Sequence, residues 1–326
     1  HPVRDRLLSS TDRNGKLATI PVVVQMVNAS AKSKPLRAMG EKVIGVHRDA
    51  WVPEFAARKF RPNAAAARPH AVRDGERTPG KVAIFATCYV NYNEPGIGHD
   101  LVKILDHNEI PHVLAEKEAC CGMPKLEQGD LASVEKLMRV NIPGLAKLAR
   151  EGYAILTPVP SCTLMYKQEL PLMFPDDEDV KAVRDAMFDP FEYLMARRRD
   201  GLLKNDFKQS LGKVAYHVPC HSRVQKGAMK TGEALKEVPG TEVVVIERCS
   251  GHAGTWGVKK EFHETALRIG RPVVRQIADF KPDYFASDCQ LAAHHIEEGL
   301  ERADGKGPAR LRHPLTLLRM AYGLPD

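Results

Sequence analysis

The sequence predicts an α/β protein of two duplicated parallel βαβ halves, related by pseudo-two-fold symmetry, with a basic helical arm at the amino-terminal end. Three segments recur in the same order, and each is a short β-branched or aromatic run that ends in a cysteine. Such runs are typical of buried parallel strands. Helical patterns separate them, and this alternation is typical of βαβ units with right-handed crossovers.

The repeated segments can be aligned one with another. The first half contains "KVAIFATCYVNYNEPG", "HVLAEKEACCG" and "GYAILTPVPSCTL", and the second contains "GKVAYHVPCHSRVQKG", "TEVVVIERCSG" and "KPDYFASDCQL". The matched cysteines are Cys88 and Cys220, 132 positions apart, Cys120 and Cys249, 129 apart, and Cys162 and Cys289, 127 apart. Pro143 and Pro272, also 129 apart, lie in the intervening helical segments. This regular offset indicates an internal duplication.

Helices are expected between and after the strands. "GHDLVKILDHNEI" places Leu101, Ile104 and Leu105 near one face. "LASVEKLMRVNIPGLAKLAREG" and "EFHETALRIGRPVVRQIADF" follow the second cysteine segment of each half. Residues 163–211 are expected to join the halves as helices, and "HPLTLLRMAYGLPD" is expected to end the chain as a short helix.

Length and composition fit a globular chain of two domains with an added arm. The 326 residues are 43% hydrophobic and 27% charged. No apolar run approaches the roughly 20 residues that cross a bilayer, and the polar start does not resemble a secretory signal. We expect an arm and linker over 1–80, a first domain over 81–211 and a second over 212–326. Because the chain starts with His1, we expect it to be part of a longer protein.

The positive charge is concentrated in the arm. Residues 1–80 hold 15 Lys and Arg against 7 Asp and Glu, while the whole chain has a net charge of +7. An arm of this kind can meet an acidic partner or an anionic membrane, or it can be a solvated arm that packs on a segment absent from this sequence. No aromatic residues alternate with the basic ones as in a base-stacking surface, so nucleic acid is not expected as a partner. Residues 61–80 are expected to form a linker.

The duplication predicts two cysteine sites. Ligands of parallel sheets gather beyond the carboxyl ends of the strands, which is where the cysteines lie. The first set is Cys88, Cys120, Cys121 and Cys162, and the second set is Cys220, Cys249 and Cys289. Thiolates that converge in this way hold iron–sulfur clusters or zinc. There are two alternatives to metal binding: the cysteines are only small buried side chains, or the adjacent Cys120 and Cys121 form a disulfide. An odd count of seven cysteines favours a reducing compartment, the cytoplasm.

The motifs "CCGMP", "PSCTLMYKQELP", "HVPCHSRVQKG", "ERCSGHAGTWGVKKEF" and "SDCQLAAHHI" resemble those of the CCG-domain proteins. This family includes the B subunits of heterodisulfide reductases, the iron–sulfur subunits of glycolate oxidases and lactate-utilisation proteins. The "CSGHAGTWG" corner and the opening "RDRLLSSTDRNGKLA" are most similar to the C subunits of anaerobic glycerol-3-phosphate dehydrogenases.

The resemblance implies an electron-transfer subunit with a cluster on the first cysteine set. Electrons would come from a flavin dehydrogenase subunit or a ferredoxin-type iron–sulfur domain and move towards quinone, with a possible peripheral position on the inner face of the membrane. Two other functions stay open: a catalytic thiol–disulfide reductase of the heterodisulfide reductase type, and a zinc-stabilised scaffold that docks partners. No catalytic residue is assigned.

The chain departs from the fullest family motif, which ends in Cys-x-x-Cys. Met165 and Ala292 stand where that last cysteine is expected. The first site therefore favours an ordinary [4Fe–4S] cluster over a five-cysteine non-cubane one. In the second site Ser250 replaces a thiolate and is a poor ligand, so iron–sulfur, zinc and an empty site are all open. His221 is the predicted fourth ligand there, with His217 and His252 as alternatives.

Overall fold

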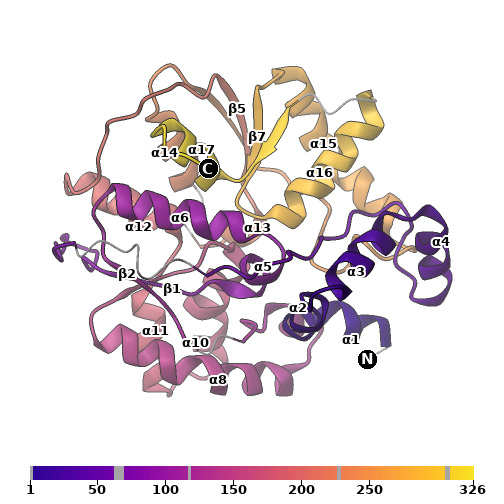
Figure 1. Ribbon diagram of the computed structural model, residues 1–326, viewed down its shortest axis with the longest axis horizontal. Helices are drawn as coiled ribbons and strands as arrows, with labels where there is room; N and C mark the ends of the chain where they lie inside the picture. Colours follow the sequence, from indigo (N-terminus) through magenta and orange to yellow (C-terminus); the bar gives the residue numbers. More distant parts are fainter. Residues whose placement is uncertain (1–2, 62–69, 117–118, 226–228, 305–308) are drawn as a thin grey trace.

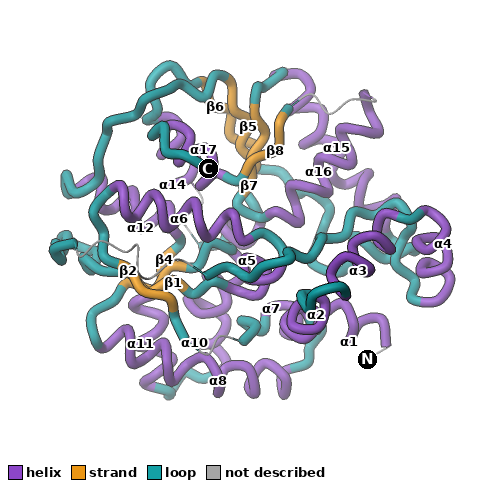
Figure 2. The backbone as a smooth tube through the Cα atoms, viewed as in Figure 1, coloured by secondary structure: helices purple, strands orange, loops and turns teal. Residues whose placement is uncertain are grey.

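The computed structural model describes residues 3–61, 70–116, 119–225, 229–304 and 309–326. Within these residues, two four-stranded parallel sheets form the framework and confirm the predicted duplicated α/β fold (Figure 2). The first sheet has the strand order β2-β1-β3-β4 and the second has the order β6-β5-β7-β8. Because the two orders are equivalent, the repeat in the sequence is also a repeat in topology.

The first copy follows the predicted segments closely. Its strands are β1 (Val82–Ile84), β2 (His112–Leu114), β3 (Ala154–Leu156) and β4 (Met187–Phe188). Its helices are α5 (Thr87–Tyr92), α6 (Pro95–His107), α7 (Met123–Leu126), α8 (Leu131–Arg150), α9 (Pro160–Leu164), the π-helix η2 (Met165–Glu169), α10 (Leu170–Met173), α11 (Glu178–Ala186) and α12 (Pro190–Arg199).

The second copy repeats this plan with fewer helices among its described residues. Its strands are β5 (Lys213–His217), β6 (Glu242–Ile246), β7 (Tyr284–Ser287) and β8 (Arg310–Arg312). Its helices are α13 (Cys220–Arg223), α14 (Met229–Lys236), α15 (His263–Phe280), α16 (Gln290–Asp304) and α17 (Pro314–Ala321). Pro143 lies inside α8 and Pro272 inside α15, as their matched positions in the sequence require.

Burial on both faces explains why the predicted runs form central strands. All three residues of β1 are fully buried, and Val82 aligns with His112 of β2 on one side and Ala154 of β3 on the other. Strands β4 and β8 were not expected, because unlike β1, β2 and β3 they do not belong to a segment of the cysteine repeat. On its own, a run of two or three residues carries no recognisable period. Each pairs at the edge of a sheet, next to β3 and β7 respectively.

The two copies are joined by equivalent pairs of helices. Helix α6 packs on α17, and α12 packs on α14. In the repeat, α6 corresponds to α14 and α12 corresponds to α17. The pseudo-two-fold relation therefore turns the α6–α17 contact into the α14–α12 contact, and the two are equivalent. Figure 1 shows α6 and α12 between the two sheets. One continuous core cluster contains Leu101 and Leu105 of α6 together with Leu315 and Leu318 of α17, so the interface is part of the hydrophobic core.

The basic arm consists of four helices that rest on both copies. They are α1 (Val3–Ser9), α2 (Thr11–Ala18), α3 (Val23–Lys32) and α4 (Lys34–Val43). Helix α2 packs on α5 of the first copy. Of the predicted linker over 61–80, residues 62–69 lie outside the described residues.

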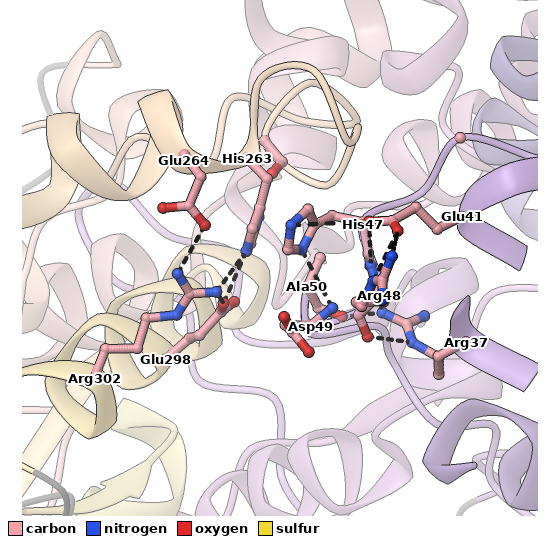
Figure 3. A network of polar contacts seen from close by, with 12 residues as sticks. Arg37, Glu41, His47, Arg48, Asp49, Ala50, His263, Glu264, Glu298 and Arg302 are labelled. Carbon is pink, nitrogen blue, oxygen red and sulfur yellow. Dashed lines mark hydrogen bonds and ion pairs between the residues drawn. The ribbon is translucent and has the colours of Figure 1, made fainter. Parts of the chain in front are cut away.

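A polar network fixes the arm to the second copy (Figure 3). The ring of His47, which follows α4, stacks on His263 at a centroid distance of 4.3 Å. Nε2 of His263 lies 2.8 Å from Glu298 Oε1, which also accepts a hydrogen bond of 2.9 Å from Arg302. A second contact lies at the start of the arm, where Asp5 pairs with Lys259 at 2.8 Å. The arm is therefore an integral part of the molecule.

Candidate metal centre

The first cysteine set lies beyond the carboxyl ends of three neighbouring strands. Cys88 is in α5 after β1, Cys120 and Cys121 follow β2, and Cys162 is in α9 after β3. Strand β1 lies between β2 and β3, so the chain switches direction across the sheet at this edge, which is where ligands of such sheets bind. Cys120, Cys121 and Cys162 are buried and Cys88 is partly buried. The fold brings together the four residues predicted to share a site.

The four thiols contact one another in a chain. The pKa values of the thiols depend on neighbouring thiols in a chain, that of Cys88 on Cys120, that of Cys120 on Cys121, and that of Cys121 on Cys162. Interaction with the neighbouring thiols of Cys121 and Cys88 holds the pKa of Cys120 well below its usual value. For Cys88, interaction with the Cys120 thiol, followed by burial, raises the pKa well above its usual value. All seven cysteines are free, so the alternative of a Cys120–Cys121 disulfide is not realised.

Four cysteines make up the donor set of the first site. No group of three or more His, Cys, Asp or Glu side chains in the described part of the chain is arranged to hold one metal ion. A four-thiolate cluster does not need its ligands to meet at one metal ion, because each thiolate binds a different iron. Iron–sulfur clusters are typically held by four cysteines, and three buried cysteines and one partly buried cysteine converge here.

Two residues that the sequence analysis missed support this set. Thr11 Oγ1, on α2 of the arm, lies 3.3 Å from Cys88 Sγ and donates to Cys120 Sγ at 3.4 Å. Asn141, on the buried face of α8, donates to the Cys120 carbonyl at 3.2 Å and to the Tyr166 hydroxyl at 2.9 Å. A polar residue on an apolar helix face was a signal for Asn141. No sequence signal pointed to Thr11, which is 77 residues before Cys88.

The glycines that follow the adjacent cysteines of the first set and the Cys249–Ser250 pair, Gly122 and Gly251, both adopt a positive φ. Gly122 has φ +99° and Gly251 has φ +85°, both in the left-handed region that favours glycine. The two differ in their surroundings. A β-carbon on Gly251 would lie 2.0 Å from the carbonyl oxygen of Ala266, whereas the nearest atom to one on Gly122 is Met165 Cε at 3.5 Å. The backbone of α15 therefore packs directly against Gly251, and no described backbone atom lies this close to Gly122.

The second cysteine set is more open than the first. Cys220 and Cys249 are exposed, and Cys289 is partly buried; burial, followed by the charge of nearby Cys249, raises the pKa of Cys220. Burial raises the pKa of Cys289 to about 11. The Gly251 N–H donates to Cys249 Sγ at 3.4 Å. Ser250 is buried, and its hydroxyl oxygen accepts the His252 N–H at 3.4 Å, so it stabilises the turn.

The histidines predicted to complete the second set have different environments. Nδ1 of His221 lies 2.8 Å from Ser161 Oγ of the first copy, and its Nε2 lies 3.9 Å from Glu127 Oε1. Both nitrogens of His217 are also bonded, to Ser287 and to the Arg248 carbonyl. His221 as a ligand stays a prediction, and this arrangement gives it no support.

His252 is the exception among these histidines. It is buried, and neither of its ring nitrogens has a hydrogen-bond partner within the described residues. Burial, with the neighbouring His295, lowers its pKa to about 3, so the ring is neutral. The rings of His252 and His295 lie 5.7 Å apart. A neutral, unpartnered imidazole three positions after Cys249 keeps its metal-binding capacity.

Comparison with known proteins agrees with this geometry. Residues 82–167 and 214–297 each match the cysteine-rich CCG domain. The chain is 30% identical over 323 residues to the C subunit of the anaerobic glycerol-3-phosphate dehydrogenase of Escherichia coli K12, covering 98% of this chain and 77% of the relative. It is 29% identical to the B subunit of the fumarate reductase (CoM/CoB) of Methanothermobacter marburgensis over 253 residues, 76% of this chain and 48% of that protein.

Two further findings bear on the site and its setting. Lactate utilization protein A of Bacillus cytotoxicus is 28% identical over 208 residues, covering 62% of this chain and 81% of that protein. Relatives of this chain are thus named as subunits of oxidoreductases, and the matched domain covers both cysteine sets. Among the described helices, none combines the length and apolar character that a bilayer span requires.

Proposed function

We propose how electrons move through this chain, which belongs to the family of cysteine-rich CCG-domain proteins and is an iron–sulfur electron-transfer subunit of an oxidoreductase. The first cysteine set, Cys88, Cys120, Cys121 and Cys162, holds a [4Fe–4S] cluster. The observation that carries this proposal is the convergence of four free, largely buried thiols at the switch point of the first sheet. When bound, the cluster supplies one-electron redox chemistry, and the chain supplies its ligands and its dry surroundings.

The surroundings of the first set favour four ligands over five. Met165 occupies the position of the fifth cysteine of the fullest family motif, and its side chain is fully buried. It packs in the same core cluster as Cys120, Cys121 and Cys162. A thioether in this place fills the space with apolar atoms and offers only a weak ligand. This supports a four-thiolate cubane over a non-cubane cluster.

The second set, Cys220, Cys249 and Cys289, is proposed to hold an iron–sulfur cluster through three thiolates. Its two exposed cysteines make it the more accessible of the two sites. We therefore assign the buried set to relay and the open set to exchange with the acceptor. A zinc ion or no metal at the second set are the other outcomes that metal analysis would distinguish.

The partner is proposed to be a flavin dehydrogenase subunit or a ferredoxin-type iron–sulfur domain that delivers electrons, with quinone as an acceptor. Free thiols throughout the chain fit a reducing compartment, which supports a cytoplasmic position. The arm supports peripheral contact with the inner face of a membrane. It exposes Leu17, Val22 and Met26, the last at 68% of its surface, and residues 1–80 carry the excess of basic side chains described above.

Membrane contact is tested by flotation of the protein with vesicles. We expect binding to vesicles that contain anionic phosphatidylserine, weaker binding to pure phosphatidylcholine, and loss of binding in Met26→Glu. The exposed Leu172→Glu variant, whose side chain lies on α10 of the first copy, is the control. Equal flotation of Met26→Glu and the unchanged protein would reject the arm as the contact.

The cluster assignment is tested by iron, zinc and acid-labile sulfide analysis with electron paramagnetic resonance on anaerobically prepared protein. We expect about four iron with matching sulfide from the first set, and loss of that amount in Cys121→Ser. Cys249→Ser is the matched control, because it removes a thiolate from the second set and should leave the first-set signal intact. One zinc and no iron would overturn the redox assignment.

A thiol–disulfide reductase is the second candidate function. The second set has three thiolates and two of its cysteines are exposed, so a metal centre there would have a free coordination position that a substrate sulfur could reach. A reductase reaction is therefore proposed at the second set and not at the buried first set. Disulfide cleavage by a loaded protein, lost in Cys249→Ser and retained in a first-set variant, would support it. An intact disulfide in the presence of a reduced, loaded protein would leave electron relay as the function.

A further inference from the structure

An open cavity lies between the two copies, beside the second cysteine set. Its volume is about 780 Å³, and its walls come from the start of α6, the first half of α16 and the segment from β8 into α17. Gln290, which follows Cys289, is one of the lining residues. The cavity therefore lies at the carboxyl ends of β7 and β8, the edge where such sheets bind ligands. Its size is that of a small-molecule site.

His313 provides an unused hydrogen-bond donor in this cavity. Its Nδ1 accepts the backbone N–H of Leu315 at 3.2 Å and caps α17, so the ring proton must be on Nε2. Burial lowers the pKa of His313 to about 4, which keeps the ring neutral. The Asp288 backbone forms a hydrogen bond to the ring that falls outside normal geometry, and Nε2 has no other hydrogen-bond partner within the described residues. A buried N–H without an acceptor of normal geometry indicates a missing ligand atom.

The acidic side chains of the wall already have cationic partners. His294 lies 2.8 Å from Glu297 and 3.7 Å from Glu94, and these carboxylates raise its pKa to about 9 against the opposing effect of burial. Asp100 pairs with Arg319 at 2.7 Å. These charges stabilise the wall and leave little net attraction for a cation.

The two arginines of the cavity have no such partners. Arg310 and Arg312 are two residues apart on β8, so their side chains leave the strand on the same side. Both are exposed, both line the cavity, and neither forms an ion pair with a described acidic residue. Two unpaired guanidinium groups beside an unused N–H are suited to carboxylate or phosphate oxygens.

We propose that this cavity binds a small organic anion, with its carboxylate or phosphate at Arg310 and Arg312 and a further oxygen accepting the Nε2 proton of His313. Gln290 of the cavity lining directly follows Cys289, so an anion bound there lies close to one ligand of the second cysteine set in the chain. The inference goes beyond electron relay, and it does not depend on a cluster being present. Binding can therefore fail or succeed independently of the proposed redox function.

The test is isothermal titration calorimetry of the full chain with inorganic phosphate, succinate and glycerol as separate probes. We expect saturable binding of at least one of the two anions and none of glycerol. Phosphate binding alone would identify a phosphate site, and succinate binding alone a carboxylate site. Arg310→Gln and Arg312→Gln should each weaken binding about tenfold, as expected for the loss of one charge-assisted hydrogen bond. Arg275→Gln, which removes an exposed charge from α15, should bind as the unchanged chain does.

A second readout uses a tryptophan at the cavity wall. Trp51 stacks on His294 at 4.0 Å, and Trp256 is the only other tryptophan in the sequence. In a Trp256→Phe background, anion binding should change the fluorescence of Trp51 with the affinity found by calorimetry. His313→Asn should lose affinity while its amide oxygen still caps α17. Equal affinity in the arginine variants, equal binding of glycerol, or no saturable binding of either anion would overturn the proposal.

Discussion

Ser161 Oγ lies 2.8 Å from His221 Nδ1, and this hydrogen bond joins the two cysteine sets. Ser161 precedes Cys162 of the first set, and His221 follows Cys220 of the second. Helices α9 and α13 pack together around this contact, and Gln225 adds a hydrogen bond of 3.2 Å to the Pro160 carbonyl. The junction therefore fixes the position of one predicted ligand from each copy relative to the other.

If His221 serves this junction, its loss should affect stability and not metal content. We expect His221→Asn and Ser161→Ala each to lower the free energy of unfolding by about 1–2 kcal/mol, because each removes a partly buried hydrogen bond. Urea denaturation measures this, and metal analysis of the same samples should be unchanged. If His221→Asn loses metal while Ser161→Ala keeps it, His221 is a ligand of the second set.

The hydroxyl of Thr11 should tune the first cluster. Hydrogen bonds to cluster sulfurs stabilise the more negative reduced state, so Thr11→Val should make the reduction potential more negative by some tens of millivolts. A net hydrogen bond of about 1 kcal/mol corresponds to roughly 40 mV for one electron. Redox titration followed by electron paramagnetic resonance measures the shift.

The matched control for this change is Thr19→Val. Thr19 Oγ1 donates to the Gly15 carbonyl at 2.8 Å at the end of the same helix, away from the thiols. Its potential should stay that of the unchanged chain. An identical potential in Thr11→Val would mean that the arm does not influence the first site.

The two corner glycines should differ in their tolerance of alanine. Gly122→Ala places a β-carbon at ordinary contact distance from Met165 and Val134 but at positive φ, which costs about 1–2 kcal/mol. Gly251→Ala adds an overlap with the Ala266 carbonyl, so we expect a loss of roughly 3–5 kcal/mol. Urea unfolding of the two variants measures the difference. Similar losses would show that α15 moves readily away from the second corner.

The sequence was most informative where the same physical requirement occurs twice. Buried parallel strands need apolar runs, and a ligand edge needs functional residues directly after them, so all six predicted strands and their cysteines could be identified. The position of Thr11 could not be predicted, because no periodicity links α2 to Cys88. The partners of His221 were equally inaccessible, because they depend on how α9 and α13 pack between the copies.

The last prediction concerns the pH dependence of stability at His294. Glu94 and Glu297 hold its folded pKa at about 9, above the usual value near 6.5, and the Trp51 ring covers one face. Protonated His294 between the two carboxylates therefore stabilises the folded state fully below about pH 6.5, and this contribution is lost as pH rises through 9. Its size should be on the order of 2–3 kcal/mol.

Urea unfolding of the unchanged chain and of His294→Gln at several pH values between 6 and 10 isolates this contribution. Other groups titrate in the same range, Asp189 among them with a pKa of about 8, but they are common to both proteins. The difference in unfolding free energy should therefore be largest near pH 6 and shrink towards pH 10. A difference that does not change with pH would mean that His294 is not protonated between its two carboxylates, and that the acidic wall of the cavity carries an uncompensated charge.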